Sequence, residues 1–279
     1  MSLKKLKFGI LIAVIGALVI SQAVTAQTPI AANTRPFEPV EELFYEAEFN
    51  RSLLRGLNVA EFRLRSSRAP VTPETKSTVD SYSLVLSADV VSKGFFTRLF
   101  NLNFREQIQS TVEASTFTLQ KNNMLDEQGK RVRTSESTYD RSKGKLSWSQ
   151  RDPNNPSAEP RQAIADFSGQ LQDVLSAIYY IRTQPLVVGK RFEVFIGESG
   201  RVYRVPINVV ERKSMKTVLG KVKVLRVEPQ LFGPNNIIDG EKGEFIFWIT
   251  DDERHIPVSA RVKTEYGTFD IKLKRVARN

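Results

Sequence analysis

The residues YSLVLSADV, at positions 82–90, decide the fold that we predict. Tyr82, Leu84, Leu86, Ala88 and Val90 alternate there with mostly polar residues. Successive side chains of a β-strand point to opposite faces, so an extended backbone places these five on one surface. The pattern therefore predicts a strand with one face on a core and the other in water, as in antiparallel sheets.

The same two-residue period recurs on both sides of this stretch. It is found at 43–49 and 60–64, and again at 203–209, 256–262 and 269–273. An antiparallel sheet of about a dozen strands tends to curl, split or close. We therefore predict an all-β, mainly antiparallel fold, a curled sheet or incomplete β-barrel.

Three segments depart from simple alternation. FIFWI, at 245–249, is apolar on both faces and predicts a central or ligand-lining strand. Within 221–227 the apolar parity changes after Val224, which indicates a β-bulge. Pro206 has no N–H to donate, so its strand should have an edge or a bulge there.

One amphipathic helix is predicted within 171–182. Leu171, Val174, Leu175, Ile178 and Tyr179 follow the i, i+3, i+4, i+7, i+8 spacing of a helical stripe. Asp173 or Ser168 can cap its start, and Pro185 prevents its continuation. A single helix amid a large sheet should cover a sheet face or an open barrel end, because its stripe has nothing else to pack against.

The N-terminal residues have the layout of a secretory signal peptide. Lysines 4, 5 and 7 precede an apolar run at 8–20, and small residues at 24–26 suit a cleavage site near Ala26. That run of 13 residues is shorter than the roughly 20 needed to span a bilayer. We predict a signal peptide at 1–26, an N-terminal tail at 27–40 and a single β-rich domain at 41–275.

Export to the periplasm follows from this prediction, with no transmembrane segment after cleavage. The chain has no cysteine, so it has neither disulfides nor a lipid-anchoring cysteine. Its formal net charge of +10 is spread along the sequence. For an exported protein that charge suits anionic lipid, acidic glycan or an acidic partner rather than nucleic acid. An ordinary solvated surface is the plainer interpretation.

The sequence predicts no catalytic residue, no metal site and no cofactor. His255 is the only histidine and follows a polar stretch typical of a turn, and the absence of cysteine excludes the usual zinc spacings. Neither a Gly-x-Ser-x-Gly elbow nor a phosphate loop is present. Paired carboxylates meet only in space, so a glycan-acting hydrolase of the cell envelope stays as an alternative.

A hydrophobic ligand is suggested by FFTRLF, at 95–100. Its aromatics could line an apolar mouth where a guanidinium meets an anionic head group, although the segment also fits a core strand. The helix and the FIFWI strand would supply further contacts. The predicted ligand residues are Phe95, Phe96, Arg98, Phe100, Tyr179, Arg182 and Trp248.

Four separated stretches carry a resemblance to a known family. They are 42–45, 173–182 with the nearby Pro-Leu and Gly that follow it, 209–213, and 246–252 leading to Ile-Pro-Val. Over roughly residues 40–275 the chain resembles the bacterial exported proteins grouped as domain-of-unknown-function family 3108. The resemblance implies an envelope location and a curved sheet or barrel with a helix packed inside or across it. It implies no activity.

These patterns together predict a function. We expect an exported, non-enzymatic binder or carrier of a hydrophobic or amphiphilic ligand, or an envelope-integrity factor acting through a protein partner. By looser analogy, the architecture is similar to periplasmic carriers of the lipoprotein-localisation type, in which an open barrel holds acyl chains. That analogy concerns the fold, which does not by itself imply function.

Overall fold

The structure is a computed structural model, and it describes residue 37 and residues 40–52, 54–69, 82–94, 103–239 and 242–278. The predicted signal peptide and most of the predicted tail lie outside the described residues. The same is true of Phe95, Phe96, Arg98 and Phe100, so their predicted role in ligand binding is not tested.

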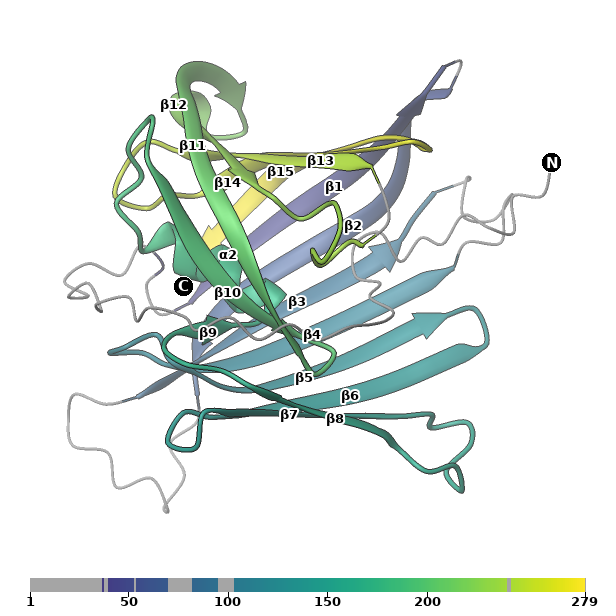
Figure 1. The fold of residues 1–279 in the computed structure, drawn as a ribbon. Coiled ribbons are helices and arrows are strands. Elements are labelled where there is room, and N and C mark those ends of the chain that lie inside the picture. Colours follow the sequence, from purple (N-terminus) through teal and green to yellow (C-terminus); the bar gives the residue numbers. More distant parts are fainter. Residues whose placement is uncertain are drawn as a thin grey trace.

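Fifteen strands of the described chain form one sheet that curls around one helix (Figure 1). This confirms the all-β curled-sheet prediction, with more strands than the dozen expected. The elements are β1 (Glu41–Arg51), β2 (Leu54–Arg68), β3 (Ser83–Ser92), β4 (Phe104–Glu113), β5 (Leu119–Gln128), β6 (Arg131–Asp140), β7 (Lys145–Arg151), β8 (Arg161–Asp166), β9 (Leu171–Gln172), α2 (Val174–Arg182), β10 (Arg191–Glu198), β11 (Arg201–Thr217), β12 (Gly220–Pro229), β13 (Gly243–Thr250), β14 (Pro257–Thr264) and β15 (Gly267–Arg278).

Neighbouring strands in the sheet are consecutive in the sequence, except that the first strand pairs with the last. The strand order runs β8-β7-β6-β5-β4-β3-β2-β1-β15-β14-β13-β12-β11-β10-β9, and every neighbouring pair is antiparallel except β9 with β10. The first and last strands therefore pair in the middle of the sheet, with Tyr45 opposite Leu273. In β3 the burial alternates along Leu84, Leu86, Ala88 and Val90, as the sequence pattern predicts.

The two ends of the sheet meet by side-chain packing. A Cβ placed on Gly197 of β10 would lie 2.9 Å from a Leu146 methyl of β7. A Cβ placed on Gly200, in the β10–β11 turn, would lie 2.4 Å from Cβ of Ala163 in β8. The absence of side chains at these two glycines lets β7 and β8 pack closely against the β10–β11 hairpin, which gives the sheet its barrel-like form.

Helix α2 lies inside the curled sheet and contacts both halves (Figure 1). Leu175 and Tyr179 pack in a cluster with β3, β6 and β7, whereas Ala177 and Ile181 pack with β10 to β13. Asp173 caps the helix, as predicted: its carboxylate accepts a hydrogen bond from the Ser176 N–H at 2.7 Å, and its own N–H donates to Ser176 Oγ at 2.9 Å. The helix begins at Val174, because Leu171 and Gln172 form β9 instead.

Two local predictions need correction or explanation. The bulge expected within 221–227 lies in the neighbouring strand, where the register shifts between Val209 and Glu211. Val224 and Leu225 are both buried because β12 has apolar clusters on both of its faces. Pro206 lies in an interior strand, but β12 ends at Pro229, opposite the next residue, so no ladder hydrogen bond is lost.

Candidate ligand-binding cavity

An apolar cavity of about 210 Å³ lies inside the curled sheet, beside α2. Its walls come from elements far apart in the sequence. Val90 and Ile108 lie on one side, Ile196 and Val205 on the other, and Ile178 comes from α2. Phe245 and Phe247 also line it, which places part of the FIFWI strand at the cavity wall. The cavity exists because α2 fills only part of the space that the sheet encloses.

Three of the residues that line this cavity have polar side chains with hydroxyl or carboxyl groups. The hydroxyl of Tyr45 donates a hydrogen bond to the Pro257 carbonyl at 2.8 Å, and Ser259 Oγ donates to the Ile271 carbonyl at 3.0 Å. Glu106, in β4, makes no side-chain hydrogen bond within the described part of the chain. The Glu106 carboxyl is therefore the lining group that is still able to bond to a ligand.

The surroundings of Glu106 favour its neutral form. Burial, together with the nearby carboxylates of Asp126 and Glu198, raises its pKa to about 8. Asp126 is the cross-strand partner of Glu106 on β5 and forms an ion pair with Arg131. Burial also raises the pKa of Glu198, on β10, to about 7. Near neutral pH the Glu106 carboxyl is thus mostly protonated and presents an O–H donor at an apolar wall.

The helix residues predicted as ligand contacts lie next to the cavity but do not line it. Tyr179 is buried, with its ring edge-on to Phe37 at a centroid distance of 5.1 Å. Arg182 is 1% exposed, and its two terminal nitrogens contact the Glu41 carboxylate at 2.7 and 3.1 Å. The Arg182 guanidinium therefore anchors α2 to β1, and this contact already occupies it.

Trp248 lies in a different part of the fold. It belongs to the apolar cluster of β1, β2, β14 and β15, whereas Phe247 faces the cavity. The cations of Lys213 and Arg261 lie 4.9 and 5.9 Å from its ring. The structure thus brings Tyr179 and Arg182 together on α2 and places Trp248 in a separate cluster.

Sequence reasoning missed Glu106, although a signal was present. In FREQIQSTVE, at 104–113, Glu106 has the same parity as Phe104, Ile108 and Val112. A carboxyl at an apolar position of a strand indicates either a paired charge or a functional group. The remaining lining residues could not be assembled from sequence, because the cavity joins strands of both halves.

No metal centre accompanies the cavity in the described residues, where no three His, Asp or Glu side chains are arranged to hold an ion. His255 lies in the turn after β13, as predicted, and its Nδ1 is 2.8 Å from the Arg182 carbonyl. It therefore supports the end of α2.

Comparison with models of known protein families shows to which family the chain belongs. The model of the family described as "Protein of unknown function (DUF3108)" matches residues 45–274. The chain belongs to the DUF3108 family. This confirms the resemblance carried by the four sequence stretches, and the family description supplies no activity. No curated protein matches this DUF3108 chain at a significant level.

Three solved structures are similar to this DUF3108 protein to different degrees. The β-barrel-like DUF1849 protein from Brucella abortus matches with a TM-score of 0.50 at 10% identity, covering 85% of this chain and 97% of that one. A candidate exported protein with a YmcC-like fold from Bacteroides fragilis has a TM-score of 0.35 at 8% identity, covering 87% and 98%. A candidate lipoprotein from Parabacteroides distasonis has a TM-score of 0.31 at 9% identity, covering 90% and 100%.

Across the described residues, no helix combines the length and the apolar character that crossing a bilayer requires.

Proposed function

We propose that this DUF3108 protein binds a hydrophobic or amphiphilic molecule inside its curled sheet and does not transform it. The observation that carries the proposal is the apolar cavity with one lining carboxyl, that of Glu106, which has no hydrogen-bond partner among the described residues. Apolar walls with a few convergent polar groups are the usual composition of small-molecule sites. Dry apolar cavities bind hydrophobic molecules because binding removes the apolar surface of the ligand from water.

The volume limits the part of the ligand that can be enclosed. At about 210 Å³ the cavity exceeds the roughly 150 Å³ that holds one benzene molecule. It falls below the roughly 300 Å³ at which drug-sized sites begin. We infer that one short alkyl chain, or the end of a longer one, enters the cavity.

The lining carboxyl limits the head group. A protonated Glu106 donates a hydrogen bond to a hydroxyl or carbonyl oxygen, and an ionised Glu106 would pair with an amine. A ligand carboxylate would meet the carboxylates of Asp126 and Glu198 as well, which is unfavourable. A neutral or cationic head group is therefore the better fit.

We also propose that the protein acts outside the cytoplasm. The support is the lysine-rich start, the apolar run at 8–20 and the small residues before Gln27. In that setting the ligand would be a lipid or amphiphile of the envelope, and an envelope protein is the alternative partner. A glycan hydrolase finds less support, because the lining carboxyl of Glu106 faces an apolar wall rather than a polar cleft.

Filling the cavity should abolish binding. Ala260 of β14 lies among the lining residues, opposite Phe247 of β13, and Ala260→Phe introduces a ring into the space. We expect its affinity for 1-octanol, measured by titration calorimetry, to fall at least about tenfold relative to the parent chain.

The matched control is Ser214→Phe, at an exposed position of β11 outside the lining. It should bind 1-octanol like the parent. Equal binding by a folded Ala260→Phe variant, with folding checked by circular dichroism, would place the ligand elsewhere and refute the proposal.

A further inference from the structure

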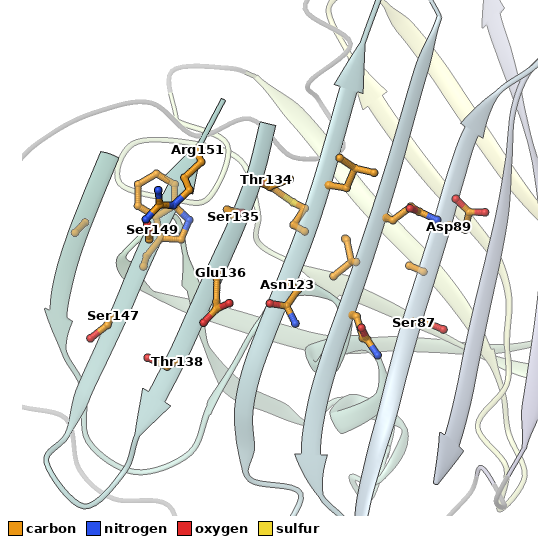
Figure 2. A pocket seen from close by; sticks show the side chains of 18 of the residues that line it. Ser87, Asp89, Asn123, Thr134, Ser135, Glu136, Thr138, Ser147, Ser149 and Arg151 are labelled. Atoms are coloured by element: carbon orange, nitrogen blue, oxygen red, sulfur yellow. The ribbon is translucent and has the colours of Figure 1, made fainter. Parts of the chain in front are cut away.

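A second concave surface lies on the opposite face of the sheet, turned away from α2. It is a broad open groove of about 1240 Å³ over β2 to β8 (Figure 2). Most of its lining side chains, including Ser87 and Asp89 of β3, have the opposite parity to the buried Leu84 and Leu86. The groove therefore lies on the other face of the sheet from the cavity, and Ala88 and Ile108 contribute to the lining of both.

One row of polar side chains crosses the whole groove in register. Each member is the cross-strand partner of the next, from β2 to β8. With strands about 4.8 Å apart, seven strands extend the row over about 29 Å. Figure 2 shows several of its members on neighbouring strands, pointing to the same side. This groove row consists of Arg65, Ser87, Gln109, Asn123, Glu136, Ser149 and Gln162.

The uncharged members of the groove row have no hydrogen-bond partner among the residues that the structure describes. The side chains of its two serines, two glutamines and one asparagine make no hydrogen bond within the part of the chain that the structure describes. The two charged members are paired: Arg65 with Glu42 at 3.4 Å and Glu136 with Lys121 at 3.1 Å. The row thus presents amides and hydroxyls that are free to bond, with little net charge.

Outside the groove, outward side chains of the sheet pair with one another. On β1, β14 and β15 the outward side chains form cross-strand ion pairs, including Lys272–Glu48 at 2.8 Å, Lys274–Glu46 at 3.0 Å and Arg261–Asp270 at 2.7 Å. Those pairs satisfy one another, as on an ordinary solvated sheet. The groove instead combines concavity with a row whose uncharged amides and hydroxyls make no hydrogen bond to other described residues.

We propose that this groove binds an extended glycan chain that lies across the strands along the groove row. A glycan presents hydroxyl and amide groups at regular intervals along its length, which matches a regular series of uncharged donors and acceptors. Nucleic acid requires a series of unpaired cations for its phosphates, whereas Arg151 is the one cation among the described lining residues that forms no ion pair. An extended peptide would pair with a strand edge rather than a strand face. An alkyl chain would not satisfy this polar row.

The test is binding of defined oligosaccharides to the purified full chain. Chitohexaose, cellohexaose and a galacturonic acid hexamer serve as probes, measured by saturation-transfer NMR and titration calorimetry. We expect at least one of the three to bind the parent chain. Ser149→Trp places a large ring on the row and should weaken that binding at least about tenfold.

Two further variants keep the test specific. Ser214→Trp carries the same change at an exposed position of β11 and should bind like the parent. The double variant Gln109→Ala/Asn123→Ala removes two row amides without adding bulk and should also bind more weakly. If none of the three probes binds the parent, or if both groove variants bind as tightly as the parent, the proposal is overturned. Ala260→Phe should leave glycan binding unchanged, which separates this site from the cavity.

Discussion

Arg182→Met is expected to lower the free energy of unfolding by about 3 to 5 kcal/mol, because it removes one member of a buried ion pair. The guanidinium and the Glu41 carboxylate are each 1% exposed and contact at 2.7 and 3.1 Å. Arg182 Nη2 also donates to the Arg254 carbonyl at 3.2 Å. Losing this cation removes the guanidinium that pairs with the buried carboxylate of Glu41, which costs far more than losing a surface pair.

Urea unfolding monitored by circular dichroism measures this loss of stability. Two further variants test whether the loss comes from the buried ion pair. Arg212→Met breaks an exposed pair with Asp251, at 2.7 Å, and should cost no more than about 1 kcal/mol. Arg182→Met/Glu41→Leu removes both charges and should recover much of the lost stability. A loss below about 1 kcal/mol for Arg182→Met alone would show that the pair does not anchor α2.

Glu106→Gln is expected to change how stability depends on pH. The pKa of Glu106 rises from an ordinary 4.5 to about 8 in the folded protein, so the folded state holds its proton more tightly than the unfolded chain does. The parent should therefore lose stability as the pH rises from 4.5 to 8. The variant cannot ionise at this position and should avoid that loss, which is on the order of 3 to 5 kcal/mol.

Urea unfolding of both proteins at several pH values checks this expectation. The two proteins should have similar stability near pH 4.5, which serves as the internal control, and the variant should be the more stable at pH 8.5. Some slope remains in both, because the pKa of Glu198 is also raised. Parallel curves over this range would contradict the assignment of Glu106 as a carboxyl held neutral at the cavity wall.

The sequence predicted the fold well because alternation is a local property. The alternation within residues 82–90 predicts the buried and the exposed face of the strand, whichever strand pairs with it. The capping of α2 by Asp173 is also local, because it involves residues three positions apart. The β12 parity change was misinterpreted for a physical reason. A strand with apolar clusters on both faces produces the same change as a bulge, and only the pairing of Val209 and Glu211 with β12 distinguishes them.

The candidate sites were much less predictable, because both depend on register and closure. The sequence pattern suggests a ligand head group for Arg182, because its partner in the fold, Glu41, lies 141 residues earlier and cannot be recognised from sequence. Trp248 was assigned to the ligand because FIFWI is apolar on both faces, and the choice of face depends on the neighbouring strands. The groove row is unremarkable in sequence, since its seven residues become a row only when six strand pairs align them.

The most direct test of ligand binding in the cavity is an isotope-filtered NOE experiment on methyl-labelled protein with unlabelled 1-octanol. Binding inside the curled sheet predicts cross-peaks from the octyl chain to the methyls of Ile108, Ile178 and Ile196, which line the cavity. Ile164, 70% exposed in the outer groove, should show none. Cross-peaks to Ile164 alone, or to no isoleucine of the cavity, would contradict the account.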